Sequence, residues 1–344
     1  MSYRVVVRDS DLAFTTMADE SILEAGLRQG INLPYGCRNG ACGACKTLVT
    51  EGRVDHDGAD PATLTDDEKA QGFTLLCCAR AESDIEIVCR EVAASAIPAK
   101  TFPARIEAMD RLASDVMRIA LRIPATERLQ FLAGQYLEIL LKNGERRAFS
   151  MANPPHDDAL IELHVRHVPG GEFTDQVFAT MKVRDILRVH GPLGSFTLDE
   201  KSERPIVCVA GGTGFAPIKA IIEHALHTGC TRPIRLYWGA RDRAGLYAIA
   251  LAERWAREHA QLHFVPVLSE PAAGDDWVGR RGLVHEAVID DLGDSGQLAA
   301  SDVYICGAPA MISAAREDFT TRCGLPAERF FADAFTFAHG TESS

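Results

Sequence analysis

The strongest constraint in this sequence of 344 residues is a loop, YGCRNGACGAC, that carries three cysteines within nine positions. Cys37, Cys42 and Cys45 are spaced as C-x4-C-x2-C, and Cys77 follows after 31 intervening residues. The N-terminal segment lacks the apolar stretch of a secretory signal, so we expect a cytoplasmic protein whose thiols stay reduced. Disulfides are therefore not expected, and metal binding or burial must explain the cysteines instead.

This spacing predicts a [2Fe-2S] cluster, because one tight loop with three thiolates and a distant fourth is the plant-type ferredoxin pattern. Gly36, Gly40 and Gly43 permit left-handed backbone conformations that turn N–H groups toward sulfur. A zinc site or a set of free thiols is the alternative, but zinc sites usually contain two C-x2-4-C pairs and only one close pair exists here. A Rieske centre needs two histidines, and none lies near the loop. Cys78 competes for the fourth position. We favour Cys77 because it follows Leu-Leu, as the ferredoxin ligand does.

The net charge of −12 excludes nucleic acid as a partner, because phosphate binding needs a basic surface. Residues 1–92 hold 16 acidic and 9 basic side chains, so over half of the excess lies there, and this acidity suits docking onto a basic patch of another protein. No apolar run approaches the roughly 18–20 residues of a membrane span, so no membrane association is expected. Four further cysteines are interpreted as buried or incidental thiols: Cys89, Cys208, Cys230 and Cys323.

The pattern along the chain predicts three domains. Residues 1–92 form a small α+β unit, with a helix from Ser21, its N-cap, to Gly30. An Ala- and Ser-rich linker is expected at 93–102. Within the first unit, strands are expected near 3–8, 46–49 and 84–89.

Residues 103–200 carry regular short strand-like runs, which predict a β-barrel or sandwich with one helix near 173–181. From 201 to 344 strands and helices alternate, which predicts a parallel α/β domain. The expected strands are 116–123, 135–141, 160–166, 186–190, 206–210, 234–238, 262–268 and 302–306, and the expected helices of the last domain are 216–227, 246–259, 283–292 and 309–321.

Residues 147–150, Arg-Ala-Phe-Ser, resemble the R-x-[YF]-S signature of the ferredoxin reductase superfamily. The resemblance implies that Arg147 meets the flavin pyrophosphate, that Phe149 lies against the flavin ring and that Ser150 bonds the nitrogen that accepts hydride. Ala148 lies within the same flavin-binding signature. A guanidinium suits phosphate and an aromatic face suits a flat ring. Phe149 stands where Tyr is commoner, so one phenol hydrogen bond is lost.

A second segment, VRHVPGGEFTDQVF, resembles the family's other flavin element. Gly170 and Gly171 lead into a helix expected to begin near Thr174, whose N-terminal N–H groups would hold pyrophosphate. GPLGSF at 191–196 resembles the turn that closes the flavin domain. For this order of motifs, the resemblance to the family implies FAD rather than FMN.

The resemblance extends to the nucleotide domain, where two turns match motifs of the family. GGTGFAP places Gly211, Gly212, Thr213 and Gly214 before a helix with Pro217 in its first turn, which suits a pyrophosphate. In CGAPAM the resemblance implies that Cys306 and Gly307 lie where nicotinamide approaches the flavin; the alternative is a buried cysteine at a strand end.

The family's closing aromatic residue corresponds to Phe335, with Phe331 as the alternative, and it would cover the flavin face. After YWGA, Arg241 could bind a 2′-phosphate, whereas Asp242 could bind a free 2′-hydroxyl. We favour NADH over NADPH.

The resemblance covers nearly the whole chain and implies a β-grasp [2Fe-2S] ferredoxin module, an antiparallel flavin barrel and a parallel α/β nucleotide domain. This order is similar to the reductase components of bacterial aromatic-ring dioxygenases and of phenol and methane monooxygenases, and to the CDP-6-deoxy-glucoseen reductases. The expected function is electron transfer from NADH through FAD and the cluster to an oxygenase or dehydrase component, by a monomer. A free-standing flavin or ferric reductase and an iron–sulfur redox sensor are the alternatives.

Overall fold

The computed structural model describes residues 2–31, 33–89, 97–124, 129–272, 274 and 276–336, which divide between two compact units. The first unit is Met1–Ala96 with the short pieces Gly194–Phe196 and Ala332–Thr336. The second contains Ile97–Leu193 and Thr197–Phe331. The barrel and the α/β domain predicted from the sequence therefore pack into one unit.

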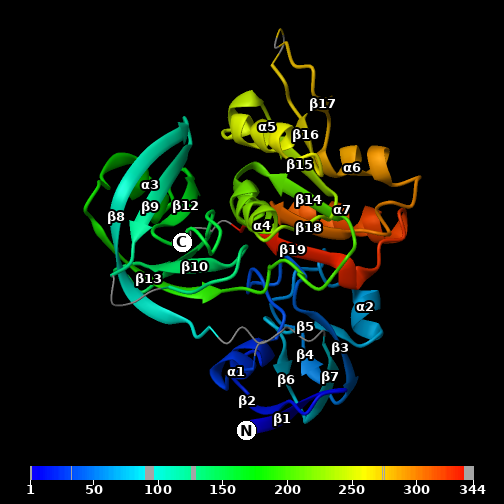
Figure 1. The fold of residues 1–344 in the computed structure, drawn as a ribbon. Coiled ribbons are helices and arrows are strands. Elements are labelled where there is room, and N and C mark those ends of the chain that lie inside the picture. The colour runs from blue at the N-terminus through cyan, green and yellow to red at the C-terminus, as the bar shows by residue number, and fades with distance from the viewer. Residues whose placement is uncertain are drawn as a thin grey trace. The chain divides into compact units, whose positions relative to one another are not determined.

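The first unit is built on a mixed five-stranded sheet in the order β2-β1-β7-β3-β5 (Figure 1). Strands β1 and β7 are parallel and the other neighbours are antiparallel. Helix α1 begins after Ser21, whose hydroxyl accepts from the Glu24 N–H while the Glu24 carboxylate bonds back to Ser21, and Gly30 is left-handed as predicted. The elements are β1 (Ser2–Val7), β2 (Ala13–Met17), α1 (Ile22–Arg28), β3 (Lys46–Glu51), β4 (Val54–Asp55), α2 (Asp66–Ala70), β5 (Phe73–Leu75), β6 (Arg80–Ala81) and β7 (Ile85–Val88).

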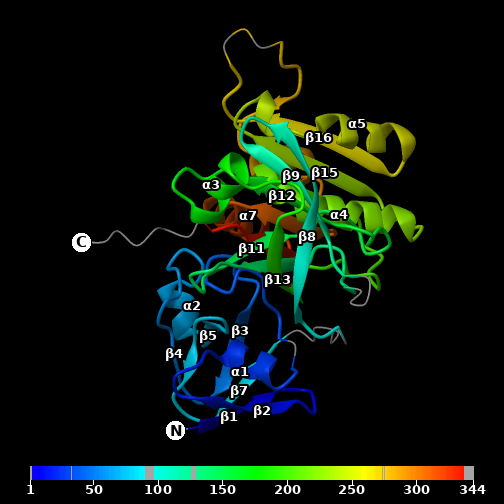
Figure 2. The ribbon, with the colours of Figure 1, turned by 90° about the vertical axis from the view of Figure 1, so that its left-hand side faces the viewer.

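The barrel has the strand order β11-β10-β13-β8-β9-β12, with antiparallel neighbours throughout. A bridge between Met151 and Leu163 joins the chain beyond β11 to β12 and closes the barrel. The long curved strand β8 runs along it (Figure 2). β8 begins at Lys100, so the last residues of the predicted linker are strand, and 93–96 lie outside the described residues. The elements are β8 (Lys100–Ala113), β9 (Val116–Arg122), β10 (Tyr136–Leu140), β11 (Arg146–Ser150), β12 (Ile161–Arg166), α3 (Glu172–Ala179) and β13 (Ile186–Leu193).

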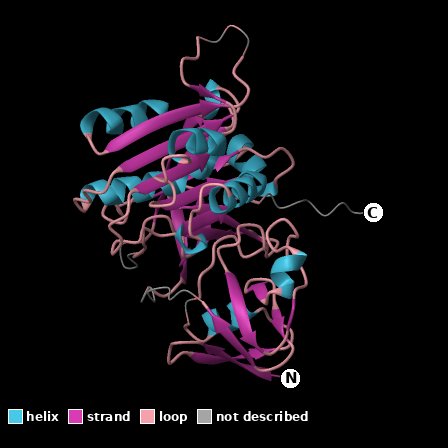
Figure 3. Cartoon of the chain, turned by 90° about the vertical axis from the view of Figure 1, so that its right-hand side faces the viewer, coloured by secondary structure: helices cyan, strands magenta, loops and turns pink. Residues whose placement is uncertain are grey.

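The nucleotide domain is a sheet in the order β17-β16-β15-β14-β18-β19 with helices on its two faces (Figure 3). The pairs from β17 to β18 are parallel. The chain runs outward from β14 to β16 and then returns to place β18 on the other side of β14, so the strand order reverses there. Ligands of such sheets bind at the carboxyl ends of the strands at this reversal. The elements are β14 (Ile206–Gly211), η1 (Gly212–Gly214), α4 (Phe215–His227), β15 (Ile234–Ala240), η2 (Arg243–Gly245), α5 (Ile249–Glu258), β16 (Leu262–Leu268), β17 (Arg280–Arg281), α6 (Val284–Leu292), β18 (Asp302–Gly307), α7 (Pro309–Thr321), η3 (Ala327–Arg329) and β19 (Phe330–Ala334).

Candidate functional site

The cysteine loop turns its backbone N–H groups toward sulfur, as the sequence predicts. Arg38, Gly40 and Gly43 have φ values of 61°, 80° and 68°, which bend the chain around the thiols. Gly36, for which left-handed backbone was also expected, does not adopt it. The Cys42 N–H lies 3.3 Å from Cys37 Sγ, and the Cys37 N–H lies 3.4 Å from Cys42 Sγ. Such N–H···S hydrogen bonds stabilise negative charge on thiolate sulfur.

The four predicted thiols are arranged as two pairs. Cys37 and Cys42 face each other within the loop, and Cys45 Sγ lies 3.3 Å from Cys77 Sγ. Among the described residues, no three His, Cys, Asp or Glu side chains are grouped to hold a single metal ion. A [2Fe-2S] cluster takes two thiolates on each iron, so a donor set of two pairs fits it. The competing Cys78 Sγ lies 3.6 Å from Cys77 Sγ. Cys77 therefore stands between Cys45 and Cys78 in this row of sulfur contacts.

Two of the remaining cysteines have the character of inert thiols. Burial raises the pKa of Cys208, in the centre of β14, to about 12. Burial also raises the pKa of Cys89 to about 11. A thiol with so high a pKa carries almost no thiolate near neutral pH, which agrees with their interpretation as structural residues.

The flavin signature lies on β11, opposite β10, with Ser150 as its last residue. Ser150 is buried, and its Oγ has no hydrogen-bond partner among the described residues. A buried hydroxyl without a partner costs about 1–3 kcal/mol, so this atom fits a site that is completed by a polar cofactor atom. Phe149 is half-buried and packs on Phe173 of α3, with ring centroids 5.2 Å apart. Arg147 pairs with the exposed Glu145.

The second flavin element differs from its prediction at the start of the helix. α3 begins at Glu172, with Gly171 as its N-cap, rather than near Thr174. The Thr174 hydroxyl instead closes the preceding turn, because it donates to Val168 O at 2.9 Å and accepts from the Val168 N–H at 3.1 Å. Gly170 is left-handed (φ 80°), and its N–H donates to the Asp175 carboxylate at 3.1 Å.

The two nucleotide turns pack directly against each other at the carboxyl ends of β14 and β18. An added Cβ on Gly214 would lie 2.1 Å from Cys306 O, and one on Gly307 would lie 3.2 Å from Gly211 Cα. Only glycine allows the backbones to approach so closely. Cys306 is fully buried there, and Thr213 is buried beside it in η1. The sequence motifs thus predicted residues that the fold brings together.

The residues proposed to read the ribose follow β15 immediately. Arg241 is exposed, whereas one Asp242 carboxylate oxygen accepts from the Gly245 N–H at 3.0 Å and caps η2. At the C-terminal end, Phe331 is buried and stacks on Tyr304 at 4.6 Å, so this alternative to Phe335 is a core residue. Phe335 follows β19 and is half-buried.

Two polar residues near these motifs were not predicted from the sequence. Arg166 Nη2 lies 3.4 Å from where a Cβ on Gly212 would be, so a guanidinium from the barrel adjoins the nucleotide turn. Asp333 is buried in β19, and burial raises the pKa of its carboxyl to about 7. Arg166 lies within the quoted segment VRHVPGGEFTDQVF, but no role was assigned to it from the sequence. An acidic residue inside the apolar stretch RFFADAF is a signal that could have drawn attention to Asp333.

Three family models match the chain in the predicted order. They describe a 2Fe-2S iron-sulfur cluster binding domain at 5–82, an oxidoreductase FAD-binding domain at 103–198 and an oxidoreductase NAD-binding domain at 208–317. No helix in the described part of the chain is both long and apolar enough to cross a membrane.

Relatives match over nearly the full length. The CDP-6-deoxy-L-threo-D-glycero-4-hexulose-3-dehydrase reductase of Yersinia pestis is 40% identical over 338 residues, covering 97% of this chain and 99% of that protein. The terephthalate 1,2-dioxygenase reductase component 2 of Comamonas sp. is 37% identical over 340 residues, covering 97% and 98%. The crystal structure of the Amycolatopsis cytochrome P450 reductase GcoB has a TM-score of 0.76 and 36% identity, covering 97% of this chain and 99% of that one.

The chain therefore belongs to the family of iron–sulfur flavoprotein reductases in which a ferredoxin domain precedes FAD-binding and NAD-binding domains. Its members include reductase components of dehydrase and dioxygenase systems. The predicted fold class, the oxidoreductase class and the [2Fe-2S], FAD and NAD cofactors are confirmed, and the zinc alternative is not supported.

Proposed function

We propose that this reductase takes hydride from NADH and delivers single electrons to a dehydrase or oxygenase component through its ferredoxin domain. The observation that carries the proposal is a contact between the flavin strand and the nucleotide helix. Lys219 of α4 donates to Ala152 O at 3.0 Å, two residues beyond Ser150. Because α4 starts directly after the glycine turn proposed to hold the pyrophosphate, this contact joins the candidate flavin motif to the nucleotide-binding motif.

Bound FAD accepts two electrons as hydride and releases them singly, and a [2Fe-2S] cluster carries one electron at a time. In this proposal the Ser150 hydroxyl would donate a hydrogen bond to the flavin. Arg147 would leave its ion pair with Glu145 and bind the flavin pyrophosphate. Phe149 covers the ring, and Cys306 provides a compact wall for nicotinamide. Phe335 is proposed to cover the other ring face. Further proposed contacts are Ala148, Gly170, Gly171 and Thr174 for FAD, and Gly212, Thr213, Gly214, Arg241 and Gly307 for the nucleotide.

We assign Cys37, Cys42, Cys45 and Cys77 as the cluster ligands. The support is the arrangement of their sulfur atoms in two pairs. The chain's acidic first domain would dock onto a basic surface of the acceptor, since opposite potentials steer such encounters. The Yersinia relative favours a CDP-hexulose dehydrase as acceptor, and the Comamonas relative an oxygenase. We further propose that the protein is cytoplasmic and monomeric, and that it prefers NADH to NADPH.

The test compares wild type with Cys45→Ser in two assays with NADH. We expect the variant to keep ferricyanide reduction, which needs only the flavin, and to lose cytochrome c reduction. Equal cytochrome c reduction by both proteins would favour the free-standing flavin reductase instead. Slow NADH oxidation with every acceptor would favour the redox sensor. A purified dehydrase or a purified oxygenase component is then added as acceptor, and the one that the reductase reduces identifies the type of partner.

A further inference from the structure

Strand β12 turns two polar side chains away from the barrel core. Leu163 and Val165 point inward and are fully buried among apolar residues. Side chains alternate along a strand, so Glu162 and His164 lie on the opposite face, which meets the nucleotide domain. They are nevertheless buried, with only 14% and 3% of their side chains exposed. Buried polar groups of this kind need partners.

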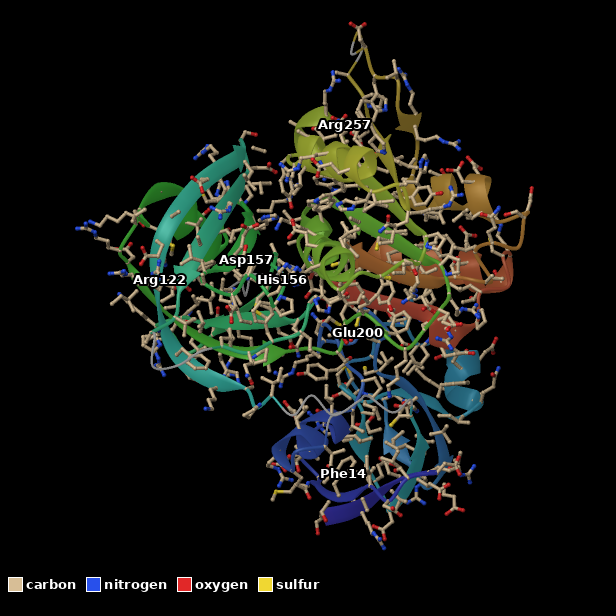
Figure 4. The ribbon with its side chains drawn as sticks, in the orientation of Figure 1. Phe14, Arg122, His156, Asp157, Glu200 and Arg257 are labelled. Atoms are coloured by element: carbon tan, nitrogen blue, oxygen red, sulfur yellow. The ribbon has the colours of Figure 1, made fainter. Side chains whose placement is uncertain are left out.

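Their partners come from the nucleotide domain. The Tyr247 hydroxyl lies 2.9 Å from His164 Nδ1, and His164 Nε2 lies 3.0 Å from Glu162 Oε1. Lys219 Nζ lies 3.4 Å from the same Glu162 oxygen and also donates to Ala152 O. We call Glu162, His164, Lys219 and Tyr247 the interdomain network. Nearby, His156 of the barrel stacks on His227 of α4 with centroids 3.6 Å apart, and Figure 4 shows His156 on this side of the barrel.

The protons of this network can be assigned from chemistry. Burial lowers the pKa of His164, so its imidazole is neutral and has one donor and one acceptor nitrogen. Burial alone would raise the pKa of Glu162, but the His164 hydrogen bond and the Lys219 charge hold it well below its usual range. The carboxylate therefore accepts from His164 Nε2–H. His164 Nδ1 must then accept the hydroxyl proton of Tyr247, whose pKa burial raises.

Tyr247 extends the network to the glycine turn. Its ring meets Trp238 edge-on, with centroids 5.2 Å apart and an interplanar angle of 85°. Trp238 Nε1–H donates to Gly212 O at 3.0 Å, and its ring stacks on Phe215, the first residue of α4. A chain of directional contacts thus runs from β12 of the barrel to the backbone of the turn proposed to hold the nucleotide.

We propose that the interdomain network positions the glycine turn Gly211–Gly214, and with it the bound nucleotide, against the flavin, with His164 and Tyr247 as positioning residues for hydride transfer. This inference rests on the proposed function. Ser150 and Cys306 take part in none of the hydrogen bonds named above, so loss of the network should leave nucleotide affinity and cofactor content intact and reduce the fraction of complexes in reactive alignment. Small misplacements of reacting groups lower rates steeply.

The decisive variant is Tyr247→Phe, which keeps the ring packing and leaves His164 Nδ1 without a donor. Tyr237→Phe is the matched control. Tyr237 is also a buried tyrosine, adjacent to Trp238 on β15, and its hydroxyl donates to Asp291 at 3.1 Å, outside the network. Both holoproteins are mixed anaerobically with increasing NADH in a stopped-flow instrument. The limiting rate of flavin reduction, the Kd for NADH and the long-wavelength absorbance of stacked nicotinamide and flavin rings are measured.

We expect Tyr247→Phe to lower the limiting rate of flavin reduction about tenfold. One unsatisfied buried hydrogen-bond acceptor shifts the equilibrium between aligned and misaligned complexes by about this factor. Its Kd should stay within about twofold of wild type, and the long-wavelength absorbance should fall. Hydrogen exchange of residues 206–222 should quicken in Tyr247→Phe and not in Tyr237→Phe. Glu162→Gln, which removes the charge facing both Lys219 and Arg118, should slow reduction in the same way.

A limiting rate for Tyr247→Phe equal to that of Tyr237→Phe would overturn the inference, as would a loss of bound FAD that accounts for the slower rate. Failure of the proposed function looks different. In that case wild type itself would not be reduced by NADH, while the hydrogen-exchange comparison would still report whether the network holds the turn.

Discussion

Replacing Gly214 with alanine tests the contact between the two nucleotide turns most severely. The new Cβ would lie 2.1 Å from the carbonyl oxygen of Cys306 and 2.5 Å from its carbonyl carbon. These are backbone atoms of a fully buried strand, so they cannot rotate aside as a flexible side chain would. Restoring ordinary van der Waals distance requires the turn and the end of β18 to separate by roughly 1 Å.

Overpacking of this kind costs 1–3 kcal/mol, and we expect about 3 kcal/mol because the obstruction is backbone. The chain's three tryptophans, Trp238, Trp255 and Trp277, all lie in the nucleotide domain. Tryptophan fluorescence during urea unfolding therefore reports the free energy of unfolding of this domain. The same displacement should raise the Kd for NADH at least tenfold, a change of about 1.4 kcal/mol, while cluster and flavin absorbance persist.

Gly229→Ala is the control, at the other end of the same helix. Gly229 is left-handed (φ 74°), and an added Cβ there meets nothing within 4 Å. It should cost only the left-handed backbone penalty of about 1 kcal/mol and leave NADH binding unchanged. If Gly214→Ala loses no more stability than Gly229→Ala and binds NADH normally, the two turns do not pack as described.

Three further outcomes are expected. Ser150→Ala should keep its FAD and slow flavin reduction by NADH roughly 10- to 100-fold in stopped-flow, the size of effect of one well-placed hydrogen-bond donor; an unchanged rate removes Ser150 from this role. Cys77→Ser should lose iron, labile sulfide and cluster absorbance, whereas Cys78→Ser should retain all three; the reverse result would make Cys78 the fourth ligand. Because burial lowers the pKa of His164, the folded protein binds this proton less readily than the unfolded chain does. The free energy of unfolding should therefore fall as pH drops below about 6.5, and His164→Gln should flatten that slope in urea titrations from pH 7 to 5.

The motifs predicted from the sequence are those in which neighbouring residues form one structural unit. The cysteine loop with its glycines, the capped helix after Ser21 and the glycine turn after β14 each depend on local backbone conformation. Their signals are therefore contiguous in the chain. The pairing of Gly214 with Cys306 could be anticipated too, because both follow parallel strands and such ends meet at one edge of a sheet.

The missed features depend on tertiary contacts or on residues that weaken a pattern. Strand β8 was not predicted, because Pro103 interrupts it and proline is disfavoured inside sheets; nevertheless Phe102, Ala104 and Ile106 alternate inward within it. The pair of His164 and Tyr247 is separated by 83 residues, and no spacing rule connects them. A histidine among apolar residues in a strand resembles an ordinary core residue until its partner is seen.

The central claim is that electrons from NADH reach a [2Fe-2S] cluster through the flavin of the same chain. The most direct measurement is low-temperature electron paramagnetic resonance of anaerobic holoprotein mixed with NADH, beside Cys42→Ser. The account predicts a reduced-cluster signal in wild type, and flavin bleaching without that signal in Cys42→Ser. Wild-type protein whose flavin bleaches with NADH while its intact cluster stays oxidised would contradict the account.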